Sequence, residues 1–321
     1  MKKIAILTSG GDSPGMNAAI RAAGKYALSQ GLIVYGIQRG YSGMLNNDIF
    51  LMDDCFLSGI IDKGGTKLLT ARCLEFLEPE FRAIAAQNMI KKGIEGLIVI
   101  GGDGSYRGAD LLSKEHGIHV VGIPGTIDND IIGTDYTIGF DTCLNTILDA
   151  ISKIRDTATS HERTILIEVM GHNSGDLALY SCLAGGGDGL LIPEMKNPIE
   201  MLALQIKGRR KIGKLHDIIL VAEGVGSVHE IEKKLASLLG AEVRSVVLGH
   251  VQRGGTPSGF DRVLATRMAV KSVDILLQNN GSVMVGIEGN RIITHPISFA
   301  WEGKKTSSIY EDFEITNILS K

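Results

Sequence analysis

Two glycine-rich turns that carry carboxylates are the residues of this chain best suited to chemistry. The run Gly96-Leu-Ile-Val-Ile-Gly-Gly-Asp-Gly-Ser105 is a predicted buried strand followed by a turn around Asp103. A second predicted strand runs into Pro124-Gly-Thr-Ile-Asp-Asn-Asp130. Glycines let phosphate oxygens approach backbone N–H groups, and carboxylates can hold Mg²⁺ or accept a proton. The pair therefore predicts phosphate and magnesium chemistry, with Asp128 and Asp130 able to act as general base and electrostatic partner beside Thr126.

Further small or polar segments follow other predicted strands. Ser9-Gly-Gly-Asp12 precedes a predicted helix, so it is either an anion site or a tight turn capped by its aspartate. Met170-Gly-His-Asn-Ser-Gly-Asp176 and the pair Glu223-Gly224 could border a site for a polar substrate. None of these segments is specific by itself.

Four arginines form the cationic set of candidates. Arginine matches phosphate oxygens with two parallel hydrogen bonds and keeps its charge. A single arginine is more often a solvated surface residue, so most of these arginines support a phosphate site only when they are considered together. Arg253 is the exception because Gly254-Gly255 follows it, whereas the nearby His250 reads by itself as a core histidine. The set is Arg72, Arg163, Arg244 and Arg253.

The elements that must position these residues alternate between strand-length apolar runs and segments of helical period. This alternation predicts an α/β fold with a mostly parallel sheet sandwiched by helices. A hairpin is predicted around Glu288-Gly-Asn290, and no linker divides the chain, so a boundary is placed near Asp141. The predicted strands are 4–8, 32–37, 97–100, 120–123, 164–170, 218–222, 245–249, 283–287 and 291–294, and the predicted helices begin after Pro14 or span 81–92, 106–116 and 143–155.

Composition excludes several classes of protein. The chain has 321 residues, a formal net charge of −3 and no basic run of the kind that binds nucleic acid. Its four cysteines are scattered without a C-x-x-C pair, which indicates a reducing cytoplasm rather than a disulfide scaffold or zinc site. No apolar run reaches the ~18 residues of a membrane span. We therefore expect a cytoplasmic protein with no membrane or nucleic-acid partner.

Taken in order, the motifs resemble the ATP-dependent 6-phosphofructokinase family of bacterial type. The resemblance runs from the first strand to about Ile287 and implies phosphorylation of fructose 6-phosphate by ATP and Mg²⁺. It also implies two similar Rossmann-like lobes with the active site in their cleft, an ATP lobe over 1–140 and a sugar-phosphate lobe over 141–321, with the C-terminal segment a candidate to return to the first lobe. A homotetramer with shared substrate sites is implied as well. The motifs are Thr8-Ser-Gly-Gly-Asp12, Pro14-Gly-Met-Asn-Ala18, Gly101-Gly-Asp-Gly-Ser105, Pro124-Gly-Thr-Ile-Asp-Asn-Asp130, Leu248-Gly-His250 and Gln252-Arg-Gly-Gly255.

The resemblance also implies a role for each matching residue. Asp103 would hold Mg²⁺, Asp128 would take the proton of the sugar 1-hydroxyl, and Arg163 and Arg244 would reach in from a neighbouring subunit. The ATP residues would be Gly11, Tyr41, Arg72, Cys73, Gly102, Asp103, Gly104 and Ser105. The catalytic and sugar-phosphate residues would be Thr126, Asp128, Asp130, Met170, Gly171, His172, Glu223, His250 and Arg253, with Arg72 also catalytic.

The chain departs from the family pattern at two places. His172 stands where many members have an arginine near the transferring phosphate. The implied binding site for ADP or phosphoenolpyruvate lacks several cations: an arginine is replaced by Asp54 and two lysines by Ile212 and Leu215, while an aspartate is replaced by Gly59. The pocket is about three charges less positive, so we expect weak effector coupling. The implied effector residues are Arg21, Lys25, Asp54, Gly59, Arg155, Gly186, Asp188, Ile212, Lys214 and Leu215.

Three other functions compete with this interpretation. A kinase of the NAD-kinase or lipid-kinase type shares only the Gly-Gly-Asp-Gly loop and leaves the 126–130 and 253–255 segments without a role. A pyrophosphate-dependent phosphofructokinase typically has an acid at the position of Gly104 and a lysine at that of Gly125, and both are glycine here. A ligand sensor without turnover would be expected to lack Asp103 or Asp128, and both are present.

Overall fold

The computed structural model describes residues 1–195, 198–279, 281–302 and 309–320, which divide into two compact units. The first unit contains Met1–Ile127, Ile131–Thr142 and the described part of 253–305. The second contains Asp128–Asp130, Cys143–Gln252 and the described part of 306–321. The two units are interleaved along the chain, because the chain returns to the first unit at Arg253 and the described residues from 309 onward belong to the second.

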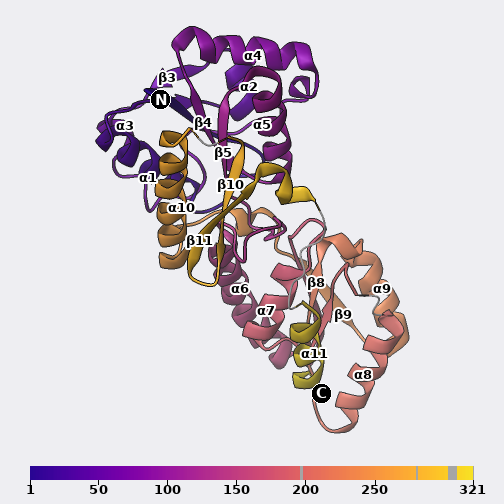
Figure 1. The fold of residues 1–321 in the computed structure, drawn as a ribbon. Helices are drawn as coiled ribbons and strands as arrows, with labels where there is room; N and C mark the ends of the chain where they lie inside the picture. The colour runs from indigo at the N-terminus through magenta and orange to yellow at the C-terminus, as the bar shows by residue number, and fades with distance from the viewer. Residues whose placement is uncertain (196–197, 280, 303–308, 321) are drawn as a thin grey trace. The chain divides into compact units, whose positions relative to one another are not determined.

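The first unit is built on a seven-stranded sheet with the spatial order β11-β10-β5-β4-β1-β2-β3 (Figure 1). The pairs among β10, β5, β4, β1 and β2 are parallel, whereas β3 and β11 pair antiparallel at the two edges. The strands are β1 Lys3–Thr8, β2 Ile33–Ile37, β3 Ile49–Leu51, β4 Gly96–Gly101, β5 His119–Pro124, β10 Val283–Glu288 and β11 Arg291–Pro296.

Helices cover both faces of this sheet, as the strand sequences require. Ile98 and Ile100 of β4 belong to a core cluster with α1 and α10, whereas Leu97 and Val99 belong to a second cluster with α4 and α5. Successive side chains of a strand point to opposite faces, so an uninterrupted apolar strand needs cover on both. The helices are α1 Met16–Ser29, α2 Gly40–Leu45, α3 Asp54–Leu57, α4 Pro79–Lys92, α5 Asp103–His116 and α10 Gly259–Leu277, with short 3₁₀ turns η1 Glu75–Leu77 and η4 Ile297–Trp301.

The second unit has an all-parallel four-stranded sheet in the order β7-β8-β6-β9. Side chains of α8 and α9 form one buried cluster with the sheet. The strands are β6 Thr164–Val169, β7 Gly189–Leu191, β8 Asp217–Ala222 and β9 Val243–Val247. The helices are α6 Phe140–Ser160, α7 Asp176–Gly185, α8 Ile199–Lys211, α9 Val228–Leu239 and α11 Ile309–Leu319, with 3₁₀ turns η2 Glu223–Val225 and η3 Gly249–Arg253. Residues 140–142 of α6 and Arg253 at the end of η3 belong to the first unit.

The predicted α/β fold with mostly parallel sheets is confirmed, and two local boundaries are corrected. The strand predicted over 245–249 is β9, which ends at Val247 because Gly249, with a positive φ, opens η3. The helix predicted from Tyr106 begins at Asp103. The Gly-Asp-Gly turn is therefore the first turn of α5, so its free backbone N–H groups are helix N-terminal donors.

Candidate active site

The turn between β4 and α5 presents one carboxylate among small residues. The Asp103 side chain is 51% exposed in the first turn of α5. A Cβ atom built on Gly102 or Gly104 would have no atom within 4 Å, so the space beside both residues is open. A Cβ on Gly101 would lie 2.4 Å from the Ser9 carbonyl oxygen, so this turn and the 9–13 loop approach only because residue 101 is glycine. The arrangement suits an anion at a helix N-terminus next to a metal-binding carboxylate.

Three predicted ligand loops lie at the same edge of the first sheet. The backbone N–H of Ser9, which follows β1, donates to the Ile100 carbonyl at 3.0 Å. The backbone N–H of Gly125, which follows β5, donates to the Gly101 carbonyl at 3.1 Å. These bonds bring the ends of β1, β4 and β5 into register, as expected from parallel strands. Thr126 follows directly, and its carbonyl accepts a bond from the Thr137 hydroxyl at 2.6 Å.

The segment that carries Arg72 and Cys73 is tied to the first of these loops by residues that the sequence analysis did not single out. The Thr70 hydroxyl donates to the Gly10 carbonyl at 2.7 Å. The Asn17 amide donates to the carbonyls of residues 63 and 64 and accepts the backbone N–H of residue 67. Arg72 is exposed, and partial burial raises the pKa of the Cys73 thiol. Asn17 lies within the motif Pro14-Gly-Met-Asn-Ala18, and this was the signal in the sequence that could have identified it as a residue that holds the 63–67 segment.

Tyr41 supports the turn between β4 and α5. Its hydroxyl donates to the Ser105 carbonyl, its ring stacks on Phe76 with centroids 4.1 Å apart, and burial raises its pKa well above the ordinary value. Phe76 is in turn held by Arg82, which donates to its carbonyl at 2.9 Å. The buried Arg82 guanidinium also pairs with Glu115 at 2.6 Å. The Tyr41 hydroxyl is thus used within the protein.

Arg253 lies against the first glycine loop. A Cβ on Gly11 would be 2.6 Å from the Arg253 Nη1 atom, so the guanidinium rests on the backbone of this loop. Its Nε atom is buried and has no hydrogen-bond partner among the described residues. Both residues belong to the first unit, although the resemblance assigns Gly11 to ATP and Arg253 to the sugar phosphate.

In the second unit the structure brings together Met170, Gly171, His172 and Glu223. The backbone N–H of His172 donates to Glu223 Oε1 at 2.7 Å, and that of Met170 donates to Gln252 Oε1 at 3.1 Å. Gly171 has φ 129°, which L side chains rarely adopt, and a Cβ there would lie 2.5 Å from the Ser174 carbonyl oxygen. The ends of β6 and β8 therefore share a polar rim, and Gln252 places the adjoining 249–252 segment beside it.

The Asp128–Asp130 segment belongs to the second unit, whereas Asp103 belongs to the first. Asn129 is buried with φ 53°, and its amide donates to Asp176 at 2.9 Å. Asp128 and Asp130 on either side are half-buried. Asn129 thus anchors the turn to the N-terminus of α7 and leaves two carboxylates flanking the anchor.

Arg163 and Arg244 share one acidic partner. Glu242 lies 3.0 Å from the Arg163 guanidinium and 2.5 Å from that of Arg244. Arg163 and Glu242 also line a cavity of about 340 Å³. Two strands, β6 and β9, pair next to each other and bring these cations together.

Three of the four cations of the implied effector site have partners within the protein. Lys25 pairs with Asp54 at 2.7 Å, Lys214 pairs with Asp188, and Arg155 donates to the carbonyls at the C-terminal end of α7. Ile212, which belongs to the implied effector site, is 78% exposed. The acid introduced at position 54 therefore directly neutralises a neighbouring cation.

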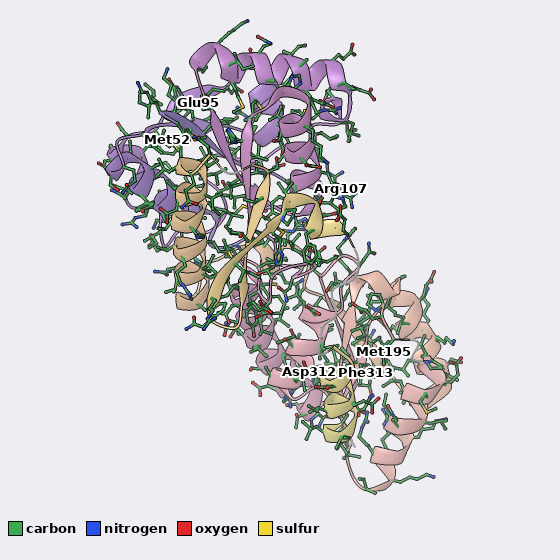
Figure 2. All side chains as sticks on the ribbon, viewed as in Figure 1. Met52, Glu95, Arg107, Met195, Asp312 and Phe313 are labelled. Carbon is green, nitrogen blue, oxygen red and sulfur yellow. The ribbon has the colours of Figure 1, made fainter. Side chains whose placement is uncertain are left out.

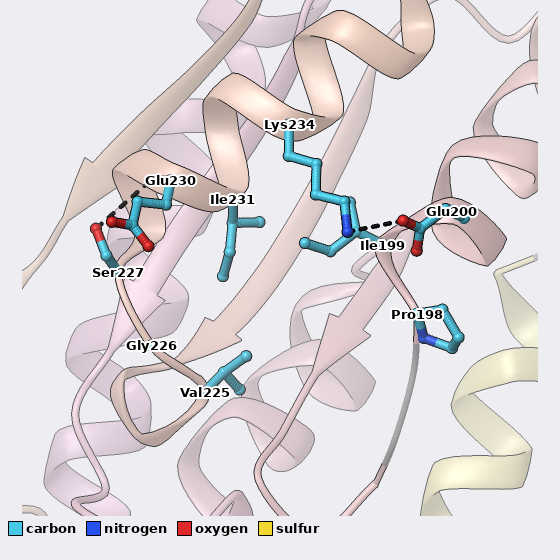
Figure 3. A pocket seen from close by; sticks show the side chains of 9 residues that line it. All are labelled: Pro198, Ile199, Glu200, Val225, Gly226, Ser227, Glu230, Ile231 and Lys234. Carbon is cyan, nitrogen blue, oxygen red and sulfur yellow. Dashed lines mark hydrogen bonds and ion pairs between the residues drawn. The ribbon is translucent and has the colours of Figure 1, made fainter.

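A larger cavity of about 410 Å³ in the second unit has none of the predicted site residues in its lining (Figure 3). It is bordered by the first turns of α8 and α9 and by η2, and the ion pair between Lys234 and Glu200 spans it at 2.7 Å. Its lining residues are Pro198, Ile199, Glu200, Val225, Gly226, Ser227, Glu230, Ile231 and Lys234.

Metal binding by protein ligands alone finds no support in the described residues, which contain no group of three or more His, Cys, Asp or Glu able to hold an ion. Mg²⁺ commonly binds through one or two carboxylates together with substrate phosphates. The exposed Asp103 at an open helix N-terminus fits that mode.

Within the same described ranges, no helix is long and apolar enough to cross a membrane.

Comparison with known proteins identifies close relatives along the whole chain. The ATP-dependent 6-phosphofructokinase of Fusobacterium nucleatum is 70% identical over 320 residues, covering 100% of this chain and 99% of the relative. The ATP-dependent 6-phosphofructokinase 1 of Clostridium perfringens is 54% identical over 313 residues, covering 97% and 98% of the two chains.

Solved structures agree. The phosphofructokinase from Saccharomyces cerevisiae superposes with a TM-score of 0.89 at 35% identity and covers all of this chain, which spans 48% of that longer chain. A pyrophosphate-dependent phosphofructokinase from Marinobacter aquaeolei gives a TM-score of 0.83 at 20% identity over 98% of this chain and 88% of its own, a likeness of fold alone. The phosphofructokinase family model matches residues 3–276, and this chain therefore belongs to the phosphofructokinase family.

Proposed function

We propose that this chain phosphorylates the 1-hydroxyl of fructose 6-phosphate with ATP, using Asp103 for Mg²⁺ and Asp128 as the base. The activity itself, that of a glycolytic ATP-dependent 6-phosphofructokinase, follows from the 70% identity to the Fusobacterium enzyme over the full chain. The assignment of residues is our proposal. The observation that carries it is the open, glycine-flanked Asp103 at the start of α5.

The first unit would bind the nucleotide. Backbone N–H groups at the start of α5 and in the 9–13 loop would bind phosphate oxygens, and Arg72 and Cys73 would lie beside the nucleotide, held in place through Thr70. Mg²⁺ on Asp103 would neutralise phosphate charge. Gly11, Gly102, Gly104 and Ser105 would line the same loops, with Tyr41 acting through Ser105.

The second unit would bind the sugar phosphate. Asp128 would accept the proton of the attacking hydroxyl, with Asp130 and Thr126 beside it, because phosphoryl transfer depends mainly on positioning and charge neutralisation. Met170, Gly171, His172 and Glu223 would form the rim, supported by the bond between His172 and Glu223. His250 of the second unit would also contact the sugar phosphate, as would Arg253, which belongs to the first unit.

The oligomer proposed is a homotetramer in which Arg163 and Arg244 serve a neighbouring subunit. Several large apolar side chains of the second unit are exposed, including Leu204 at 64% and Leu319 at 74%, as expected of a surface that another subunit covers. We place the enzyme in the cytoplasm.

Allosteric control is proposed to be weak. The pairs Lys25–Asp54 and Lys214–Asp188 supply internal anions to the cations that an anionic effector would need. An effector phosphate must displace those acids and recover its own desolvation cost.

A coupled assay of fructose 1,6-bisphosphate formation tests the function, with ATP and pyrophosphate compared as donors. Product is expected with ATP. Formation with pyrophosphate alone would favour the second branch of the family, and formation with neither donor would refute the proposal.

A further inference from the structure

Arg107 contacts two other side chains of the first unit near the N-terminus of α5, those of Asp103 and Trp301. Arg107 lies one turn after Asp103, and its Nε atom is 3.5 Å from Asp103 Oδ2. Its guanidinium carbon lies 4.9 Å from the centre of the Trp301 ring, over the ring face. Arg107 is labelled at the outer edge of α5 in Figure 2. Trp301 ends η4, so the far end of the chain supplies a platform for a cation beside the predicted metal ligand.

The pair with Asp103 is weak enough to exchange. The two side chains are 54% and 51% exposed, and ion pairs with that much contact with water contribute little to stability. A divalent cation on Asp103 would repel the guanidinium and compete for the same carboxylate oxygen. The contact between Arg107 and the Trp301 ring requires no anion. It can therefore keep Arg107 near Asp103 after a metal ion has replaced the guanidinium on that carboxylate.

We propose that Arg107 is a nucleotide-binding residue: it pairs with Asp103 in the protein by itself, and it would donate to an anionic oxygen of the nucleotide when Mg²⁺ binds Asp103. Trp301 holds the guanidinium in place in both states. This inference rests on the proposed function, because it requires a metal–nucleotide complex at Asp103. It adds to the loop residues a side chain that neither the motifs nor the resemblance identified.

The role predicts effects of opposite sign on metal and on nucleotide. In Arg107→Met the carboxylate has lost its competitor, so Mn²⁺ alone, used as a paramagnetic substitute for Mg²⁺, should bind about threefold more tightly. MgATP should bind about tenfold more weakly because a charge-assisted hydrogen bond to the nucleotide is lost. A purely structural role would not move the two affinities in opposite directions.

The experiment measures Mn²⁺ binding by electron paramagnetic resonance and MgATP binding by calorimetry on the full chain. Trp301 is the chain's one tryptophan, so its fluorescence reports directly on the platform. The matched control is Lys114→Met on the same helix, which removes the Lys114–Asp110 pair of 2.7 Å farther from the loop. This control should change neither affinity by more than about twofold.

Arg107→Lys keeps the charge and should recover most of the MgATP affinity. Unchanged MgATP binding in Arg107→Met, or a change of both affinities in the same direction, would overturn the inference. If the unaltered protein binds no MgATP, the proposed function itself is wrong, so the two failures are distinguishable.

Discussion

Replacing Gly104 by aspartate should weaken ATP binding without destabilising the protein. A Cβ at this position meets no atom within 4 Å, so the new side chain has room. Gly104 is the second residue of α5, where a glycine costs roughly 0.5–1 kcal/mol relative to alanine and an acid gains about 0.3–1 kcal/mol from the helix dipole. We therefore expect a melting temperature equal to or above that of the unaltered protein.

The cost should fall on the nucleotide. The added carboxylate lies beside Asp103, where we propose that the phosphates of ATP bind. The new carboxylate and a phosphate oxygen are like charges, and two such charges 4 Å apart repel by about 1 kcal/mol in water and about 4 kcal/mol near a protein surface. Because this helix end is half-exposed, we take about 2 kcal/mol, which corresponds to a roughly thirtyfold rise in KM for ATP.

Steady-state kinetics with ATP and with pyrophosphate, together with thermal melts, measure these effects. Gly104→Asn is the matched control because asparagine has nearly the same shape as aspartate and no charge. It should change KM for ATP by less than about threefold. An equal rise in the asparagine variant, or no rise in the aspartate variant at an unchanged melting temperature, would refute the electrostatic reasoning.

Four further outcomes are expected. Asp128→Ser should lower kcat by orders of magnitude and leave ATP affinity nearly unchanged, and a collapse of ATP binding with kcat retained would reassign the residue. His172→Arg should raise kcat at neutral pH, which a profile from pH 6 to 8 would show or exclude. Millimolar ADP or phosphoenolpyruvate should shift half-saturation by fructose 6-phosphate less than about fivefold. Burial raises the pKa of Asp261 to about 6, so the neutral carboxyl stabilises the protein near pH 4 and this stabilisation is lost as pH rises through 6. The melting temperature of the unaltered protein, relative to that of Asp261→Asn, should therefore fall over that range. A difference in melting temperature that stays constant from pH 4 to above pH 6 would contradict this.

The sequence alone predicted which chemistry the loops could perform. Glycine and carboxylate residues directly after apolar runs, as around Asp103 and Asp128, are local patterns. They predict the end of a strand and the class of ligand that could bind there. The period of the apolar residues likewise determined the α/β class, since side chains alternate along a strand and recur each turn of a helix. These signals depend on neighbours in the chain, which is why the motifs around them could be read without a structure.

The tertiary structure alone decided which distant segments share a unit. Val283 of β10 pairs with Val121 of β5, and this pairing returns the 253–302 region to the first unit although it follows the whole second sheet. The sharing of Glu242 by Arg163 and Arg244, and the stacking of Arg107 on Trp301, are contacts of the same kind. They depend on which strands pair and which faces pack, and many alternative pairings would satisfy the same local pattern, so the choice is made only when the whole core is buried at once.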